Sequence, residues 1–382
     1  MRSDNGVTPF PDPTDTTDRD DPMQLALELA QCAIGLSEPN PRVGCVIADA
    51  AGRVIGQGHT QQAGGPHAEV MALRDAQSRG ESVVGATAYV TLEPCAHHGR
   101  TPPCCDALIA AGVARVQFAL EDPNPLVAGQ GAARLRAAGI EVTAGSHADQ
   151  ARELNIGFFS RMQRQRPWLR MKVAVSLDGR SALENGVSQW ITGEAARIDG
   201  HAWRKRAGAL LTGVGTVLED NPRLDVRWVD TALQPLRVVV DSRLETPLAS
   251  RILDAPGACL LYAAQPHPER QAALEARGAS IALAPSPSGK VDLVAMLADL
   301  AQRGINELHV EAGHKLNGSF VRERLVDEFL IYMAPTLLGS GREMAAFGPL
   351  KRLEDGLALR FHSVTMIGDD LRLIARPAAP GR

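Results

Sequence analysis

Three residues that can bind a metal ion, His67, Cys95 and Cys104, constrain the fold of this chain more than any other feature. Histidine nitrogen and cysteine sulfur are common zinc ligands. Three protein ligands leave the fourth position of the zinc tetrahedron open to water, which distinguishes a catalytic zinc from a structural one. Glu69 follows the histidine by two residues and can carry the protons that a hydrolytic attack requires. The pattern therefore predicts a catalytic zinc site.

The residue pattern around these side chains predicts a layered α/β domain. Asp21 can cap a first helix that starts at Pro22. We expect one helix to begin near His67 and another at Cys104, whereas Cys95 follows a strand. Helix amino termini carry partial positive charge and stabilise thiolates. The expected helices are 67–78 and 104–111, and the expected strands are 43–48, 53–59, 87–92 and 115–120.

The composition is that of a globular chain long enough for two domains. The chain has 382 residues, of which 45% are hydrophobic and 22% charged, and its formal net charge is −4. This charge gives no general attraction to nucleic acid or anionic membranes. No apolar run approaches the roughly 20 residues of a spanning helix, and the amino terminus lacks a signal-peptide pattern. With six cysteines, too few for a disulfide scaffold, the sequence favours a cytoplasmic protein without nucleic-acid or membrane partners.

Two segments are expected to lie outside the folded domains. Residues 1–21 are rich in Asp, Thr and Pro and poor in apolar side chains, so we expect a disordered acidic tail. Residues 161–167 are basic and polar, and we expect a solvated linker there rather than a nucleic-acid-binding arm. The linker would separate a first domain, 22–160, from a second, 168–382. In the second domain strand and helix signals alternate to the end of the chain, which implies a mainly parallel sheet.

The spacing of the two cysteines departs from the signature of zinc nucleobase deaminases. That signature combines His-x-Glu with Pro-Cys-x-x-Cys, whereas here the segment 96–103 separates Cys95 from Cys104. The segment is polar and basic, and we expect it to arch over the open zinc position, so that His97 and Arg100 can contact a substrate. Buried apolar thiols at the two cysteines and a solvated Arg100 are the alternatives.

Two glycine-containing turns indicate a nucleotide site in the second domain. Gly213-Val-Gly-Thr216 follows an expected strand, and Glu311-Ala-Gly313 follows another and opens a helix, where anions bind well. The Gly-x-Gly-x-x-Gly fingerprint of Rossmann domains does not follow a strand here. On spacing alone, ordinary turns are an equal alternative.

Longer motifs resemble one enzyme family along nearly the whole chain. They are similar to those of the bifunctional deaminase/reductase family of riboflavin biosynthesis. The motifs are Asn40-Pro-Arg-Val-Gly44, His67-Ala-Glu-Val70, the segment from Pro94 to Cys104, Met171-Lys172, Ser176-Leu-Asp-Gly-Arg180, Ser188-Gln-Trp-Ile-Thr192, the segment from Thr216 to Leu224, and Val310-Glu-Ala-Gly313. The resemblance implies a cytidine-deaminase-like first domain and a second domain similar in fold to dihydrofolate reductase, which binds NADPH without the Rossmann motif.

The resemblance implies that the first domain is a zinc-dependent pyrimidine deaminase. It would convert 2,5-diamino-6-(5-phosphoribosylamino)pyrimidin-4(3H)-one to 5-amino-6-(5-phosphoribosylamino)uracil. Glu69 would move protons from the attacking water to the ring nitrogen and then to the departing ammonia. The residues that would hold zinc are His67, Cys95 and Cys104, and those that would hold the substrate are Asn40, His97 and Arg100. Some members of the family have lysine where Arg100 stands.

The resemblance also implies that the second domain reduces the ribose of this product, with hydride from NADPH going to C1′. The residues that would contact NADPH are Ala174, Trp190, Thr216, Asp220, Ser242, Gly313, His314, Lys315, Leu316, Asn317, Gly318 and Ser319. Those that would contact the substrate are Lys172, Ser188, Arg204, Leu224, Arg227 and Glu311, with the two arginines at its phosphate. Lys172 could protonate the reacting centre or simply end a strand, and Trp190 could instead anchor the sheet. A homo-oligomer formed through this domain is implied as well.

Two other classes of function stay open as alternatives. A zinc deaminase acting on another nucleobase, within nucleic acid and with an accessory second domain, would be expected to carry basic and aromatic surface, whereas only 4% of the residues are aromatic. A zinc-stabilised scaffold without catalysis would be expected to fill all four zinc positions with protein ligands. We therefore expect a bifunctional enzyme whose partners are small-molecule phosphoribosylaminopyrimidines.

Overall fold

The computed structural model describes residues 21–97, 102–125 and 127–378. The described residues up to Arg166 form one compact unit, and those from Pro167 onward form another. The expected acidic tail, apart from Asp21, lies outside the described residues. Residues 161–164 of the expected linker belong instead to a helix, Ile156–Arg164, and the division between the two units falls after Arg166. This helix is amphipathic and buries Phe158 and Phe159, and Arg161 and Arg164 lie in its last turn.

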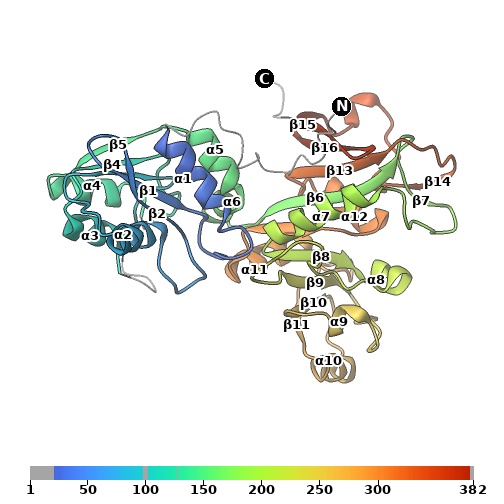
Figure 1. Cartoon of the computed structure of the whole chain (residues 1–382). Coiled ribbons are helices and arrows are strands. Elements are labelled where there is room, and N and C mark those ends of the chain that lie inside the picture. The colour runs from blue at the N-terminus through green and yellow to red at the C-terminus, as the bar shows by residue number, and fades with distance from the viewer. Residues whose placement is uncertain (1–20, 98–101, 126, 379–382) are drawn as a thin grey trace. The chain divides into compact units, whose positions relative to one another are not determined.

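The first unit is a five-stranded sheet with helices on both faces (Figure 1). The strand order is β2-β1-β3-β4-β5; β1 is antiparallel to β2 and β3, and β3, β4 and β5 are mutually parallel. The elements are α1 Pro22–Gln31, β1 Gly44–Ala48, β2 Val54–His59, α2 Ala68–Ser78, β3 Thr87–Val90, α3 Cys104–Ala111, β4 Arg115–Phe118, α4 Gln130–Ala137, β5 Glu141–Ala144, α5 Ala148–Leu154 and α6 Ile156–Arg164.

Two strand glycines let α1 and α2 pack directly against this sheet. A Cβ atom at Gly44 would lie 1.8 Å from the carbonyl oxygen of Ala26 in α1. A Cβ atom at Gly58 would lie 2.6 Å from the backbone nitrogen of Ala72 in α2. Gly58 pairs with Cys45, the neighbour of Gly44, and successive strand residues point to opposite faces. The two helices therefore cover opposite faces of the sheet.

The second unit is built on a nine-stranded sheet (Figure 1). Its order is β11-β10-β9-β8-β12-β6-β13-β16-β15, and the seven strands from β11 to β13 are parallel, so the expected mainly parallel sheet is confirmed. The elements are β6 Trp168–Ser176, β7 Arg180–Leu183, α7 Glu194–Arg206, β8 Ala209–Gly213, α8 Val214–Asp220, β9 Leu236–Val240, α9 Arg251–Asp254, β10 Cys259–Ala263, α10 Pro268–Glu275, β11 Ala279–Leu283, α11 Leu293–Gln302, β12 Glu307–Val310, α12 His314–Arg322, β13 Glu328–Ala334, β14 Gly341–Glu343, the 3-10 helix Leu353–Asp355, β15 Leu359–Ile367 and β16 Asp370–Pro377.

The carboxyl-terminal end of the chain differs from the expected alternation of strands and helices. After β13 the last regular elements are two long strands, β15 and β16, which pair antiparallel. Gly368, with φ 62°, lies in the turn between them, and such a left-handed conformation is what a tight hairpin turn requires. The hairpin joins the sheet through β16, which is antiparallel to β13.

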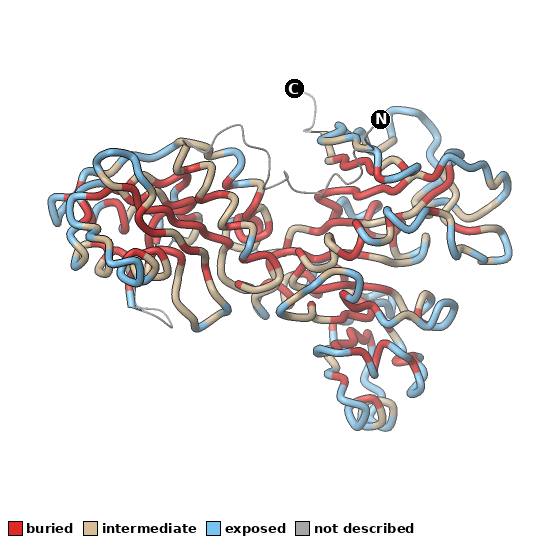
Figure 2. The backbone as a smooth tube through the Cα atoms, in the orientation of Figure 1, coloured by how far each residue is buried: buried red, intermediate tan, exposed pale blue. Residues whose placement is uncertain are grey.

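Neighbouring residues of the central strands belong to two different cores. Leu211 and Val238 pack with α11 and α12, whereas Leu210 and Val239 pack with α9 and α10 on the other face. Both faces of the parallel sheet are therefore buried, which is usual for parallel sheets. Figure 2 shows the buried residues concentrated along the strands of each unit.

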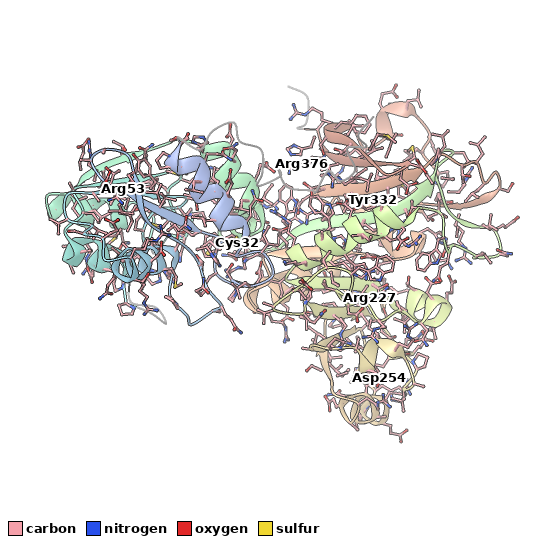
Figure 3. The ribbon with its side chains drawn as sticks, viewed as in Figure 1. Cys32, Arg53, Arg227, Asp254, Tyr332 and Arg376 are labelled. Atoms are coloured by element: carbon pink, nitrogen blue, oxygen red, sulfur yellow. The ribbon has the colours of Figure 1, made fainter. Side chains whose placement is uncertain are left out.

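Helix α7 is attached to β13 by a buried hydrogen bond. The hydroxyl of Tyr332, which is labelled in Figure 3, donates to Asp199 of α7 at 2.5 Å. Arg372 of β16 also donates to this carboxylate, at 2.9 and 3.0 Å. The three side chains position α7, which carries several residues of the site described below.

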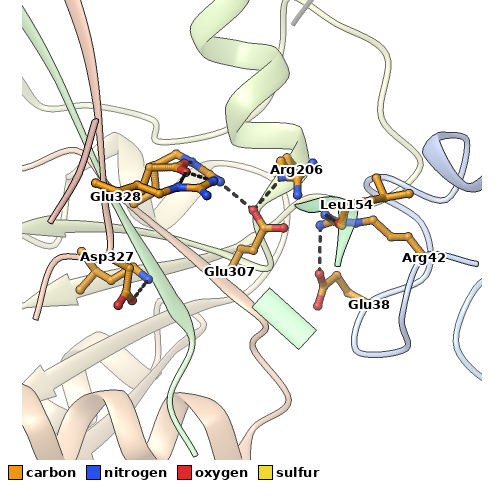
Figure 4. Close-up of polar contacts among 10 residues, drawn as sticks. Glu38, Arg42, Leu154, Arg206, Glu307, Asp327 and Glu328 are labelled. Carbon is orange, nitrogen blue, oxygen red and sulfur yellow. Dashed lines mark hydrogen bonds and ion pairs between the residues drawn. The ribbon is translucent and has the colours of Figure 1, made fainter. Parts of the chain in front are cut away.

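A buried ion network joins the amino-terminal ends of three parallel strands. Arg170 of β6 donates to Glu307 of β12 at 2.9 Å and to Glu328 of β13 at 2.5 Å, and Arg206 donates to Glu307 at 2.9 Å (Figure 4). The loss of one partner would leave a buried charge uncompensated, which is strongly destabilising. The network therefore favours the observed pairing of these strands.

Among the helices in the described ranges, none is long and apolar enough to cross a membrane.

Candidate active sites

His67, Cys95 and Cys104 converge in the first unit. Nδ1 of His67 lies 3.3 Å from Sγ of Cys104 and 3.7 Å from Sγ of Cys95, and the three ligand atoms all lie within 4.8 Å of one another. Nitrogen and sulfur ligands of a tetrahedral zinc, about 2.0–2.3 Å from the metal, are about 3.3–3.8 Å apart. The donor types and the separations therefore fit zinc. In the ranges that the structure describes, no second group of three such ligands occurs.

Two of these ligands lie at helix amino termini and the third lies in the loop after a strand, as predicted. His67 immediately precedes α2, Cys104 is the first residue of α3, and Cys95 follows β3. The backbone N–H of Cys104 donates to the sulfur of Cys95 at 3.4 Å. The hydrogen bond from the Cys104 thiol, helped by His67 and opposed by burial, lowers the pKa of Cys95 to about 4. A thiolate is the form of cysteine that binds metal.

Glu69 lies in the first turn of α2, next to the three ligands. Its side chain is buried, with 3% of the residue exposed. Burial raises the pKa of Glu69 to about 7, with a further contribution from the negative charge of Cys95. A carboxyl group that titrates near neutral pH can both accept and return a proton.

A cavity of about 330 Å³ opens onto Glu69 and the ligands. Asn40 and His97, both predicted to contact substrate, line it, whereas Arg100 lies outside the described residues. Asp122 and Asn124, which the sequence analysis missed, line it as well. Both follow β4, whose carboxyl end lies beside that of β3 in a parallel pair. The tendency of ligands to bind at the carboxyl ends of parallel strands could have indicated them.

Helix α6 also contributes to this cavity through Phe158, Arg161 and Met162. Arg161 donates to the carbonyl oxygen of Pro39 at 3.0 Å, next to Asn40, and its guanidinium carbon lies 5.6 Å from the ring centre of Phe158. The sequence carried no signal for this contact, because the arginine belongs to the segment that we interpreted as a linker.

The second unit holds a cavity of about 490 Å³ at the carboxyl ends of its parallel strands. The two glycine-containing turns meet there, and the N–H of Gly313 donates to Oγ1 of Thr216 at 3.1 Å. The predicted NADPH residues that line the cavity are Ala174, Trp190, Thr216, Asp220, Gly313, His314 and Asn317. All six predicted substrate residues of this unit line it too: Lys172, Ser188, Arg204, Leu224, Arg227 and Glu311.

Five predicted NADPH residues do not line this cavity. They are Ser242, Lys315, Leu316, Gly318 and Ser319. The last four lie in α12, where successive side chains point in different directions, so that only part of the run 313–319 can face one cavity. The hydroxyl of Ser242 accepts the N–H of Val291 at 3.2 Å. Their contacts with NADPH stay predictions.

Glu311 is surrounded by cations at the wall of this cavity. Arg204 donates to its two carboxylate oxygens at 2.5 and 2.9 Å, and Nζ of Lys172 lies 3.7 Å away. Burial favours the neutral acid, but Arg204 and then Lys172 outweigh it and hold the pKa of Glu311 well below its usual range. Arg204 is therefore already paired with a carboxylate that stays ionised at neutral pH.

Several further residues of the second cavity were missed by the sequence analysis. They include Arg197, His201, Arg223, Trp228 and Arg342. Burial, followed by the charges of Arg204 and Arg227, lowers the pKa of His201 to about 3, so that its ring is neutral at physiological pH. Arg227, labelled in Figure 3, donates to Asp225 at 2.8 Å, and Arg223 donates to the same carboxylate at 2.8 Å.

Two domain families match the chain and define its class. Residues 16–120 match the cytidine and deoxycytidylate deaminase zinc-binding region, and residues 167–373 match the RibD C-terminal domain. Together with the His/Cys/Cys cluster and the two cavities, these matches define a zinc-dependent deaminase joined to an NADPH-dependent reductase. The expected cytidine-deaminase-like and dihydrofolate-reductase-like fold classes are confirmed.

Full-length relatives identify the family. The riboflavin biosynthesis protein RibD of Escherichia coli is 44% identical over 368 residues, which cover 92% of this chain and 97% of the relative. The structure of Acinetobacter baumannii RibD has a TM-score of 0.86 at 41% identity, covering 94% and 99%. The diaminohydroxyphosphoribosylaminopyrimidine deaminase/5-amino-6-(5-phosphoribosylamino)uracil reductase of Thermotoga maritima has a TM-score of 0.83 at 32% identity, covering 94% and 98%. The chain belongs to the RibD family of bifunctional riboflavin biosynthesis enzymes.

Proposed function

We propose that the first unit deaminates 2,5-diamino-6-(5-phosphoribosylamino)pyrimidin-4(3H)-one to 5-amino-6-(5-phosphoribosylamino)uracil, and that the second unit reduces the ribose of this product with NADPH. The observation that carries the proposal is the convergence of His67, Cys95 and Cys104 beside a buried Glu69. Family membership supports the choice of substrate, because the Thermotoga maritima relative bears these two activities in its name.

In the proposed deamination, His67, Cys95 and Cys104 hold zinc. Zinc, when bound there, acts as a Lewis acid that lowers the pKa of water and so supplies a nucleophile at neutral pH. Glu69 takes one proton from the attacking water and gives it to the ring nitrogen. It then moves the remaining hydroxyl proton to the amino group, which departs as ammonia as the carbonyl forms. Burial raises the pKa of Glu69 towards the working pH, and this favours a group that both accepts and returns a proton.

The remaining walls of the first cavity would hold the substrate. Asn40 and His97 line the cavity and are assigned to the pyrimidine and its phosphoribosyl group. Arg100 is assigned to the same group from its position in the sequence. Asp122 and Asn124 offer further hydrogen-bonding groups on the same wall.

In the proposed reduction, NADPH occupies the side of the second cavity formed by Trp190, Thr216 and Gly313, and the ribose lies beside Lys172. NADPH supplies a hydride to C1′ of the ribose. Lys172 is assigned to polarising or protonating the reacting centre, and Glu311 holds its ammonium group at 3.7 Å. Arg227 is assigned to the substrate phosphate. Arg223 and Arg227 both pair with the carboxylate of Asp225, so these three side chains together keep one net positive charge for an anion.

The proposal is tested by an assay that follows ammonia release and NADPH oxidation separately. Glu69→Gln should slow ammonia release by at least about a hundredfold, the lower range for removal of a general acid–base. Zinc should stay bound, and reduction of the supplied uracil intermediate should continue at the wild-type rate. Glu81→Gln, a change in the same unit outside the cavity lining, is the matched control. Loss of zinc from the Glu69 variant would contradict the assigned role.

We also propose that the chain forms a homo-oligomer through its second unit. β15 is the edge strand of the nine-stranded sheet, and Phe361, Val364 and Met366 on it are 70%, 56% and 55% exposed. A long apolar edge strand favours pairing with another chain. Sedimentation should give a mass above the 40.7 kDa of one chain, and Phe361→Lys should lower that mass.

A cytoplasmic location is proposed from the six free cysteines, which a reducing compartment preserves.

A further inference from the structure

One wall of the reductase cavity is a stack of three side chains, Trp190, Arg197 and Trp228. The guanidinium carbon of Arg197, in the first turn of α7, lies 4.9 Å from the ring centre of Trp190 and 5.6 Å from that of Trp228. The two tryptophans are 65% and 41% exposed, which is unusual for such large apolar side chains. A single cation thus contacts two indoles that both face the cavity.

The other contacts of Arg197 attach the same wall to α7. Its Nη1 donates to the carbonyl oxygen of Thr192 at 2.9 Å, two residues beyond Trp190. Its Nε is buried and has no hydrogen-bond partner among the residues that the structure describes. Burial raises the pKa of Asp370 and the charge of Arg197 opposes that shift, although the described residues show no ion pair between the two side chains. Arg197 therefore interacts with rings and a backbone carbonyl rather than in an ion pair, a role that suits a planar guanidinium.

Trp228 is enclosed by further residues of the cavity. The ring centre of His201, also on α7, lies 4.9 Å from that of Trp228, and the guanidinium carbon of Arg227 lies 5.5 Å from it. The stack therefore connects Trp190, which is assigned to NADPH, with Arg227, which is assigned to the substrate phosphate. α7 anchors it at two positions, Arg197 and His201.

We propose that Arg197 is a positioning residue of the reductase site. It holds the indoles of Trp190 and Trp228 in the orientation that receives a planar ring of NADPH before the cofactor arrives. A site that is already ordered spends less free energy on fixing side chains when the ligand binds. Arg197 therefore sets the affinity for NADPH. The inference rests on the proposed reductase function.

Intrinsic fluorescence gives a direct measurement of this effect. All four tryptophans of the chain, Trp168, Trp190, Trp203 and Trp228, belong to the second unit. Quenching of their emission by NADPH reports binding without turnover. In the full-length, zinc-loaded enzyme, Arg197→Gln should raise the Kd and the KM for NADPH about tenfold, or about 1.4 kcal/mol, with a smaller change in kcat. Arg197→Lys should lie between, because it keeps the charge and loses the planar group.

The matched control is Lys205→Gln, which removes one positive charge from the same helix outside the cavity lining and should keep the wild-type Kd. A wild-type Kd and KM in Arg197→Gln would overturn the inference while leaving the reductase function intact. A wild-type enzyme whose emission NADPH does not change would instead contradict the proposed reductase function.

A second pair of variants covers the case in which Arg197→Gln fails to fold, as judged by circular dichroism and by its emission spectrum. Trp228→Leu removes one ring of the stack and should weaken NADPH binding. Trp228→Phe keeps an aromatic face and should bind NADPH more tightly than Trp228→Leu. Equal affinities of these two variants and the wild type would overturn the inference.

Discussion

Two buried glutamates, Glu69 and Glu93, and one partly buried glutamate, Glu311, differ in chemistry because their surroundings differ. Burial and the charge of Cys95 raise the pKa of Glu69 to about 7, which suits a proton carrier. Arg204 holds Glu311 ionised despite its burial. Glu93 accepts the N–H groups of Gly129 and Ala132, each at 3.0 Å, and so satisfies the backbone at the start of α4. Residue type alone would not distinguish these three roles.

The buried His201 predicts acid sensitivity of the second unit. Burial first, and then Arg204 and Arg227, lower the pKa of His201 from 6.5 to about 3. Between these values the unfolded chain binds a proton that the folded unit does not, so stability is lost as the pH falls through this window. In the His201→Gln variant, the free energy of unfolding should fall less steeply with decreasing pH, by up to about 1.4 kcal/mol per pH unit. Urea unfolding at several pH values, followed by tryptophan emission, measures it. Equal pH dependence in both proteins would contradict the prediction.

At the scale of elements, the ends of α2 and α3 bring the deaminase site together. The two helices supply His67, Glu69 and Cys104 from their first residues or the residue before them. Partial positive charge at both amino termini favours the negative sulfur and carboxylate groups gathered there. Placement at helix ends also holds ligand geometry more rigidly than a free loop would.

The cap of α1 gives a prediction for the stability of the first unit. The carboxylate of Asp21 accepts the N–H groups of Met23 and Gln24 at 2.8 and 3.4 Å, as the sequence predicted. Asp21→Ala should lower the free energy of unfolding of this unit by about 1 kcal/mol, whereas Asp21→Ser, which can still cap, should lower it by less. Because this unit lacks tryptophan, its unfolding is the transition that circular dichroism detects and tryptophan emission does not. Equal losses in the two variants would mean that the cap is not the cause.

At the scale of the whole molecule, each unit has its own hydrophobic core and its own cavity. The residues that line the zinc-site cavity all lie before Pro167, and those that line the reductase cavity all lie after it. The two chemical steps therefore depend on separate sets of side chains.

Removal of zinc should thus affect one activity only. Treatment with a chelator should abolish ammonia release and lower the unfolding temperature of the first unit, because a ligand that binds only the folded state stabilises it. The Kd for NADPH and the unfolding of the second unit, followed by tryptophan emission, should stay unchanged. Restoration of ammonia release by added zinc is the control. A chelated enzyme that no longer binds NADPH would contradict the independence of the two sites.

The local chemistry of the sequence was enough to predict that His67, Cys95 and Cys104 meet and where α1, α2 and α3 start. These features depend on the spacing of a few neighbouring residues and on helix-capping preferences, which act over one or two turns. The β15–β16 hairpin and the continuation of α6 past Ser160 were not predicted, because their apolar positions became informative only when the sheet and core that they pack against were known.

The tertiary structure alone decided which distant side chains share a wall and how deeply each is buried. Asp122 reaches the zinc-site cavity because β4 lies beside β3, and Arg197 meets Trp190 and Trp228 because α7 packs beside two separate loops. Burial likewise raised the pKa of Glu69, an effect that depends on every element that excludes water from it. Residue identity thus determined which chemistry is available in this chain, and long-range packing determined where its side chains meet and how burial shifts their pKa values.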